Sequence, residues 1–258
     1  MGKIIVINSG KGGVGKTTLT ANLGIALANL TENTVVLDTD LGLRNLDLAL
    51  GLESMVINDI IDVVTEECTL REAVLRDEKC GTLAFLPASQ FKDKSLLTVD
   101  KYRNLLTKLK ARYDYVLVDS PAGIDDGFDI ALTMCDMAIV VVNPDPYSLR
   151  DADRVVALCE DKNIEDIRIV INRMRAKMVN EGIMLNIESI IEALGVRLLG
   201  VVHEDENMVK NTIEGVPAVL DKKSKSGKAF TDIAKRIRGE KIPVIEIKKR
   251  GLKRLFSK

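Results

Sequence analysis

Residues 10–18, GKGGVGKTT, could bind a nucleoside triphosphate. They fit the phosphate-loop pattern G-x-x-x-x-G-K-[ST], follow an apolar run and open a stretch with helical spacing. Glycines let main-chain amides surround phosphate oxygens, while Lys16 pairs with the β and γ phosphates and the Thr17 hydroxyl ligates Mg²⁺. The pattern therefore predicts that ATP with Mg²⁺ binds to the whole loop, namely Gly10, Lys11, Gly12, Gly13, Val14, Gly15, Lys16, Thr17 and Thr18.

The same stretch also fits the dinucleotide fingerprint G-x-G-x-x-G through Gly10, Gly12 and Gly15. Asp38 ends the next apolar run, where a dinucleotide-binding enzyme places the acid that binds ribose. Lys16 directly after the last glycine, followed by a threonine, argues against this alternative, because a dinucleotide pyrophosphate needs neither a cation nor a metal-binding hydroxyl there. A merely flexible glycine turn would explain neither residue.

Carboxylates that could hold the metal and a water follow two other apolar runs. VVLDTD ends in Asp38 and Asp40, and YVLVDSPAG places Asp119 at the end of its run. An acid at the carboxyl end of a buried parallel strand points into the phosphate crevice, so we expect Asp38 and Asp119 to ligate Mg²⁺ together with Thr17, directly or through water. Asp40 is the candidate for orienting the attacking water, with a turn-capping role as the alternative.

Short buried strands that alternate with helices must position these residues. Apolar runs rich in Val and Ile recur at residues 3–8, 34–38, 82–86, 113–119, 137–143, 167–172 and 197–202. Segments with helical spacing occupy residues 17–30, 99–111, 148–161, 187–194 and 231–238. The pattern predicts an α/β fold, a doubly wound, mostly parallel sheet with helices on both faces. We expect one P-loop ATPase domain over residues 1–242, then a linker and tail over residues 243–258.

The length of 258 residues and the hydrophobic content of 46% allow one sizeable core. A net charge of −1 gives no sign of bulk affinity for nucleic acid, and we expect no sequence-specific nucleic-acid partner. The cysteines at positions 68, 80, 135 and 159 form no close pair, which favours buried reduced thiols over a zinc or iron–sulfur site. No signal sequence or membrane-spanning run is recognisable, so we expect a cytoplasmic protein.

The tail concentrates positive charge, because residues 248–258 contain six basic residues and no acidic one. Helical numbering predicts an apolar stripe of Ile247, Leu252, Leu255 and Phe256 with basic side chains around its flanks and back, among them Lys249, Arg250, Lys253 and Arg254. Such a segment can lie in an anionic bilayer surface, where one copy should bind weakly and two copies in a dimer more tightly. A disordered basic end and a nucleic-acid-binding tail are the alternatives, although the second does not explain the apolar spacing.

Motifs along almost the whole chain resemble those of the MinD family of septum-site-determining proteins, which are deviant P-loop ATPases. They are SGKGGVGKTT with the additional Lys11, DTDLGLRNLDLALGLE, LPASQFKDK, DSPAGID, LRDADR, INR and GKAF. Phosphate loops are common, but GLRNLDL joined to DSPAGI is specific within the wider family that includes the DNA-partition ATPases. The resemblance implies hydrolysis of ATP to ADP and phosphate by a homodimer that forms when ATP binds.

The resemblance also implies roles for single residues. Lys11 would reach the phosphates bound by the other subunit, which makes physical sense because phosphoryl transfer needs added positive charge. Asn45 would help hold the catalytic water beside Asp40. Asn172 would contact the adenine amino group, with Arg173 beside it in the same cofactor-binding motif. A solvated loop lysine and capping asparagines are the alternatives.

The family's cycle supplies the expected partners and location. We expect an ATPase that moves between the cytoplasm and the cytoplasmic face of the membrane, recruits the septum inhibitor MinC and is activated by MinE. Related regulators that place flagella or partition DNA are the alternative functions, whereas iron–sulfur carriers are disfavoured because no cysteines are paired. The sequence departs from the family's pattern at His203, which borders the base, and at Pro146 and Tyr147 beside the partner-binding helix over residues 148–161.

Overall fold

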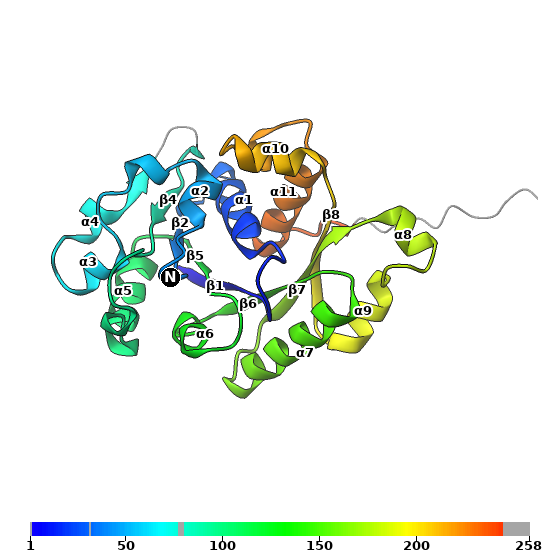
Figure 1. The fold of residues 1–258 in the computed structure, drawn as a ribbon, viewed down its shortest axis with the longest axis horizontal. Helices are drawn as coiled ribbons and strands as arrows, with labels where there is room; N and C mark the ends of the chain where they lie inside the picture. The colour runs from blue at the N-terminus through cyan, green and yellow to red at the C-terminus, as the bar shows by residue number, and fades with distance from the viewer. Residues whose placement is uncertain (1, 31, 77–79, 245–258) are drawn as a thin grey trace, which may run out of the picture.

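A mostly parallel sheet forms the centre of the computed structural model, which describes residues 2–30, 32–76 and 80–244 (Figure 1). Its eight strands lie in the order β3-β4-β2-β5-β1-β6-β7-β8. Every pair of neighbours is parallel except β3 and β4. The strands are β1 (Lys3–Asn8), β2 (Thr34–Asp38), β3 (Leu75–Arg76), β4 (Ala84–Leu86), β5 (Tyr115–Asp119), β6 (Met137–Val142), β7 (Ile167–Met174) and β8 (Arg197–His203).

Helices cover both faces of this sheet, as predicted for a doubly wound fold (Figure 1). Buried residues of α1, α2 and α11 pack on one face, and those of α3, α4, α5, α6, α7 and α9 pack on the other. The helices are α1 (Lys16–Asn29), α2 (Leu46–Leu50), α3 (Ile60–Val64), α4 (Leu70–Ala73), α5 (Val99–Lys110), α6 (Asp126–Ala131), α7 (Pro146–Asp161), α8 (Ala176–Asn180), α9 (Ile187–Leu194), α10 (Asn207–Ile213) and α11 (Lys225–Ile237).

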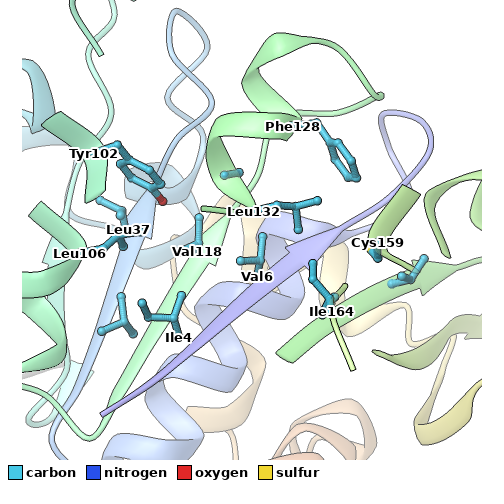
Figure 2. Packing of buried hydrophobic residues seen from close by; sticks show 14 of the residues in the cluster. Ile4, Val6, Leu37, Tyr102, Leu106, Val118, Phe128, Leu132, Cys159 and Ile164 are labelled. Carbon is cyan, nitrogen blue, oxygen red and sulfur yellow. The ribbon is translucent and has the colours of Figure 1, made fainter. Parts of the chain in front are cut away.

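Alternate residues of the central strands point to opposite faces and are buried on each. On β1, Ile4 and Val6 belong to one core cluster, whereas Ile5 and Ile7 belong to the other. Figure 2 shows the first cluster, in which Tyr102 of α5 and Phe128 of α6 lie over the sheet. Burial on both faces leaves the strand ends as the places where polar groups can be exposed, so the parallel strands deliver their last residues to one edge.

The predicted last helix is wrong at its start. It was expected over residues 231–238, but α11 begins at Lys225 with Ser224 as its N-cap, the Ser224 hydroxyl accepting the Gly227 N–H at 3.0 Å. A Cβ at Gly227 would lie 2.3 Å from the Ala218 carbonyl oxygen, so this glycine serves close packing inside the helix rather than a helix break. The six short helices α2, α3, α4, α6, α8 and α10 were also not predicted.

The predicted membrane-binding tail lies outside the described residues, which end at Val244. In the part of the chain that is described, no helix combines the length and the apolar character needed to cross a membrane. Of the four cysteines expected to be buried, Cys80 and Cys159 are, whereas Cys68 and Cys135 are only half-buried. The expectation is therefore correct for two of them.

Candidate nucleotide-binding site

The phosphate loop connects the end of β1 to the start of α1, as the motif requires. Gly15 is the N-cap of α1 and has a φ of 102°, a left-handed conformation that favours glycine. A Cβ at Gly15 would lie 2.4 Å from the Nδ2 atom of Asn172, so the neighbouring strand also leaves no room for a side chain. Gly10 is equally constrained, since its Cβ would lie 2.5 Å from the Cβ of Asp151 on α7. The loop can therefore close around a ligand only because these positions are glycines.

Lys16 begins α1 and is almost completely buried, with 7% of its surface exposed. Burial lowers the pKa of Lys16, although the charges of Asp119 and Asp40 oppose this change. The ammonium group thus lies in a partly desolvated position close to acids, where its attraction for phosphate oxygens is stronger than in water. This placement agrees with the predicted contact between Lys16 and phosphates.

Asp38 and Asp119 lie side by side at the ends of β2 and β5, where they are register partners. Both are buried. Asp119 Oδ1 accepts a hydrogen bond from the Thr20 hydroxyl at 3.0 Å. The two oxygens of Asp38 accept the backbone N–H groups of Asp40 at 2.9 Å and Leu46 at 3.2 Å. Asp38 therefore also orders the loop that follows β2.

The electrostatics of these two carboxyl groups favour a cation between or beside them. Burial raises the pKa of Asp119 to about 6, although the hydrogen bond from Thr17 and the charge of Lys16 oppose the rise. Burial and the neighbouring Asp119 raise the pKa of Asp38 well above its usual range. Two adjacent buried carboxylates ionise together only when positive charge compensates them. The three predicted metal ligands, Thr17, Asp38 and Asp119, are thus brought to one place.

These residues fit Mg²⁺ better than a metal held only by the protein. In the described ranges, no three His, Cys, Asp or Glu side chains converge as a metal site. Mg²⁺ usually keeps several waters and is held by one or two carboxylates together with phosphate oxygens of a substrate. A hydroxyl and two carboxylates beside a phosphate loop match that donor set.

Asp40 lies half-buried on the turn between β2 and α2. Burial raises the pKa of Asp40, while the charges of Lys16 and Lys94 oppose the rise. Asn45 is exposed at the N-cap of α2 and makes no side-chain capping hydrogen bond, so the capping alternative for it is not observed. The structure places Asp40 and Asn45 on one short loop, with no hydrogen bond between these two described side chains.

Lys11 is half-exposed on the phosphate loop. Its carbonyl oxygen accepts a hydrogen bond from the Ser9 hydroxyl at 2.8 Å, which fixes the main chain at this point. Its ammonium group forms no ion pair with any residue that the structure describes. The main chain of Lys11 is therefore held while its side chain remains available to a ligand or to another molecule.

A cavity of about 290 Å³ lies next to the phosphate loop, on the side of β7 and β8. Asn172 on β7 donates a hydrogen bond from Nδ2 to the Val14 carbonyl oxygen at 2.7 Å, which leaves its amide oxygen as an acceptor. Arg173, which follows Asn172, has a φ of 56°, in the left-handed region. The cavity is lined by Gly15, Thr18, Asn172, Arg173, Val202, His203, Glu204, Asp205 and Met208. The predicted base-binding residues Asn172 and Arg173 therefore border a cavity next to the phosphate loop.

His203 is the last residue of β8. Its carbonyl oxygen accepts a hydrogen bond from the Ser226 hydroxyl at 3.3 Å. The adjacent Glu204 forms an ion pair with Arg175 beyond β7. These contacts build the far wall of the cavity. Of its lining residues, the sequence predicted Gly15, Thr18, Asn172, Arg173 and His203, whereas Val202, Glu204, Asp205 and Met208 were missed.

Two further residues of the site were not predicted. Thr39 donates a hydrogen bond from its hydroxyl to the Asp119 carbonyl oxygen at 2.8 Å, joining the ends of β2 and β5. Lys94, from the segment before α5, lies close enough for its positive charge to lower the pKa of Asp40. Thr39 follows a buried strand and lies in the motif DTDLGLRNLDLALGLE, but neither feature assigns it this contact. Lys94 ends the motif LPASQFKDK, which gives it no role at the site, because its segment reaches Asp40 only through the fold.

A model of the AAA domain family matches residues 2–173 of the chain. Along nearly the full length, the chain is 43% identical to the septum site-determining protein MinD of Bacillus subtilis, over 256 residues that cover 98% of this chain and 96% of that protein. The chain belongs to the MinD family. As a MinD-family member it has the ATPase fold shared with the DNA-partition ATPases, in agreement with the predicted P-loop architecture.

Solved MinD structures have the same fold as this MinD-family chain. The MinC:MinD cell division protein complex of Aquifex aeolicus contains a chain that matches with a TM-score of 0.89 and 42% identity, covering 95% of this chain and 99% of that one. The septum site-determining protein MinD of Pyrococcus horikoshii, solved in complex with Mg-ADP, matches with a TM-score of 0.82 and 32% identity over 92% of this chain and 96% of that one. Neither match leaves a large part of this chain unaligned.

Proposed function

We propose that the chain is a Mg²⁺-dependent ATPase that acts as a membrane-cycling switch in placing the division septum. The observation that carries the proposal is the burial of Lys16 in a glycine loop beside the paired carboxylates of Asp38 and Asp119. This arrangement provides positive charge for phosphates and oxygen ligands for a metal within one crevice. The Mg-ADP bound by the P. horikoshii relative supports the same chemistry here.

Adenine would bind in the cavity beside β7 and β8. The Asn172 amide is held by its hydrogen bond to Val14, so its oxygen has a fixed direction in which to accept a hydrogen bond from an exocyclic amine. A guanine base presents a carbonyl oxygen at the equivalent position, which would oppose the amide oxygen. The site therefore favours ATP over GTP.

Hydrolysis transfers the γ-phosphoryl group of ATP to a water molecule, with ADP as the leaving group and phosphate as the other product. Bound Mg²⁺ supplies positive charge to the phosphate oxygens. Lys16 stabilises the charge that develops on them, and Asp40 orients the attacking water, with Asn45 on the same loop assisting. Lys11 of a second copy would add a further cation, which makes turnover depend on a homodimer that ATP closes. The side chain of Lys11 pairs with no carboxylate of the described chain, in keeping with that role.

The proposed cellular role follows from the family. The A. aeolicus relative forms a complex with MinC, so we propose that the ATP-bound dimer recruits a MinC-type septum inhibitor and is activated by a MinE-type partner. The dimer would present two copies of the tail, residues 247–258, to the anionic cytoplasmic face of the membrane, and hydrolysis would release them to the cytoplasm. The surface of α7, with Tyr147 72% exposed near its start, is the proposed contact for these partners.

The nucleotide site can be tested by two substitutions. Lys16→Ala should abolish binding of Mg·ATP in titration calorimetry, because the buried cation is lost. Asp40→Ala should keep binding but lose turnover in a phosphate-release assay. Lys108→Ala, on the exposed face of α5, is the matched control for removal of a lysine and should change neither quantity. Full turnover by the Asp40→Ala protein would remove this residue from the mechanism.

The membrane switch can be tested by sedimentation with anionic liposomes in the presence of ATP, ADP or no nucleotide. The full chain should pellet with ATP only, and a chain ending at Glu246 should remain in the supernatant in all three conditions. Equal pelleting of the full chain in all three would contradict the nucleotide switch even if membrane binding were real. Salt-sensitive DNA binding by the shortened chain would instead favour a partition function.

A further inference from the structure

The turn that carries Asp40 and Asn45 contains a strained residue between them. Arg44 has a φ of 47°, in the left-handed region that an L-amino acid with a long side chain rarely adopts. The turn is closed by two backbone hydrogen bonds, from the N–H groups of Leu43 and Arg44 to the Asp40 carbonyl oxygen, each at 3.2 Å. Such strain persists only where surrounding contacts hold it, and it is concentrated at functional sites.

One contact is suited to hold Arg44 in this conformation. Its Nε atom lies 2.6 Å from Oδ2 of Asp47, in the first turn of α2. The side chain of Arg44 is 19% exposed and that of Asp47 only 1%, so water screens this ion pair far less than a surface pair. The pair is a close charge contact without hydrogen-bond geometry, and it ties the Arg44 side chain to α2.

Asp47 is itself anchored to the body of the protein. Its Oδ1 atom accepts the Leu48 N–H at 2.8 Å, and its carbonyl oxygen accepts the Leu52 N–H at 2.9 Å. Leu46, Leu50 and Leu52 on either side are buried in the core on the α1 face of the sheet. The Asp47 carboxylate is therefore fixed in position where it contacts the strained residue Arg44.

Asn45 is held from both sides by these contacts. On one side Arg44 is paired with Asp47, and on the other the Leu46 N–H donates to Asp38 Oδ2 at 3.2 Å. We infer that the Arg44–Asp47 ion pair is a positioning device for ATP hydrolysis, which fixes Asp40 and Asn45 relative to the phosphate loop. This inference rests on the proposed function, since it assigns a task to Arg44 within that reaction. Arg44 and Asp47 act through the loop and need not touch the substrate.

The test compares three variants of the full chain, Arg44→Gln, Arg44→Lys and Arg44→Gly. Arg44→Gln should lower kcat for ATP roughly ten- to hundredfold, because small displacements of catalytic groups have effects of this size. The affinity for Mg·ADP should change by less than about twofold, since the phosphate loop and the base cavity are untouched. Amide hydrogen exchange over residues 40–47 should become several-fold faster. Arg44→Lys keeps a cation and should recover part of the lost kcat.

Comparison of Arg44→Gly with Arg44→Gln separates the strain from the ion pair, because Arg44→Gln removes the pair but leaves a side chain at the positive φ. Glycine adopts a positive φ readily, so this variant removes the strain and the pair together. We expect kcat to fall as in Arg44→Gln, because the loop is then unstrained but no longer held. Full kcat in Arg44→Gly, or in Arg44→Gln, would overturn the inference.

The matched control is Lys110→Gln. Its Nζ atom lies 2.7 Å from Asp136 in an ion pair with exposures of 17% and 36%, at the opposite end of the strands. Loss of that pair should lower thermal stability without changing kcat, which shows that breaking an ion pair is not enough. If the unsubstituted chain hydrolyses ATP and Arg44→Gln is equally fast, only this inference fails. If the unsubstituted chain does not hydrolyse ATP, the proposed function fails and takes the inference with it.

Discussion

The Asn172 side chain on β7 donates a hydrogen bond to the carbonyl oxygen of Val14 in the phosphate loop at 2.7 Å. This contact joins two segments that the sequence separates by 158 positions. The same side chain lines the cavity next to the loop, and the Val14 side chain is buried in the core. One amide group therefore links the shape of the phosphate loop to the shape of the base cavity.

Asn172→Asp should weaken binding of Mg·ADP by roughly ten- to hundredfold, because a carboxylate would replace the donor and face the Val14 carbonyl oxygen. A lost hydrogen bond and a repulsive acceptor pair at a half-buried place cost about 1–3 kcal/mol. Titration calorimetry measures the effect. Asn104→Asp on the exposed face of α5 is the control for the added charge and should bind normally. Normal affinity in the Asn172→Asp protein would mean that the contact does not shape the site.

Gly15→Ala should prevent nucleotide binding, because its φ of 102° and the 2.4 Å approach of its Cβ to Asn172 force the loop to move. Gly182→Ala is the matched control. Gly182 also has a positive φ, of 72°, but a Cβ there would meet nothing within 4 Å. Both variants should lose about 1 kcal/mol of stability from backbone strain, and only Gly15→Ala should lose binding of a fluorescent ATP analogue. Equal binding by the two proteins would show that the close approach has no consequence.

The long buried elements could be predicted from sequence, because burial on both faces removes polar residues from β1, β2 and β6. Helices α5, α7 and α9 have polar and apolar faces and were placed within two residues at each end. The helices of four to seven residues were missed because they are too short for a helical period. Two carried another signal, since α3 and α4 begin with capping boxes at Asp59 and Thr69.

The residues of the candidate site also fall into those that the sequence predicts and those that it does not. Residues of local motifs, such as Lys16 and Asp119, could be found because the chemistry depends on their spacing along the chain. Asn172 was assigned through a family resemblance, and its hydrogen bond to Val14 could not be foreseen. Lys94 was missed because only packing of its loop against the Asp40 turn brings it near. Contacts between distant segments depend on the final register and packing of the sheet, which no local pattern contains.

Tyr102→Phe should stabilise the protein. Tyr102 is fully buried on α5 (Figure 2), and its hydroxyl has no hydrogen-bond partner among the described residues. Burying an unpaired hydroxyl is unfavourable, so its removal should raise the free energy of unfolding by about 1 kcal/mol. Tyr113→Phe is the control, because the Tyr113 hydroxyl accepts a hydrogen bond from Arg76 at 3.4 Å. Its removal should not raise the free energy of unfolding. A clear destabilisation of Tyr102→Phe in urea titration would reveal a partner for the hydroxyl.

Asp119→Asn should change the pH dependence of stability in the metal-free protein. Burial raises the pKa of Asp119 from 3.8 to about 6, so folding favours its protonated form. The stability that this group contributes is complete below about pH 4 and is lost as the pH rises through 6. Asparagine stays neutral, so the variant should match the original chain near pH 4 and exceed it at pH 8, by up to about 3 kcal/mol for a shift of this size. Urea titrations at the two pH values measure the difference.

Asp166→Asn provides a control of opposite sign for that experiment. Burial of Asp166 tends to raise its pKa, but hydrogen bonds from Arg168 and Lys3 outweigh it, and the pKa is lowered. Its contribution to stability is therefore present above its usual pKa and lost as the pH falls, so Asp166→Asn should be less stable than the original chain at pH 8.

Mg·ADP should stabilise the original chain at pH 8 and fail to stabilise Asp119→Asn, because the metal needs the ionised carboxylate. If Asp119→Asn were more stable than the original chain by the same amount at both pH values, ionisation of the buried Asp119 carboxylate beside Asp38 would not be the cause. Compensation of that buried charge would then not explain any stabilisation by the metal.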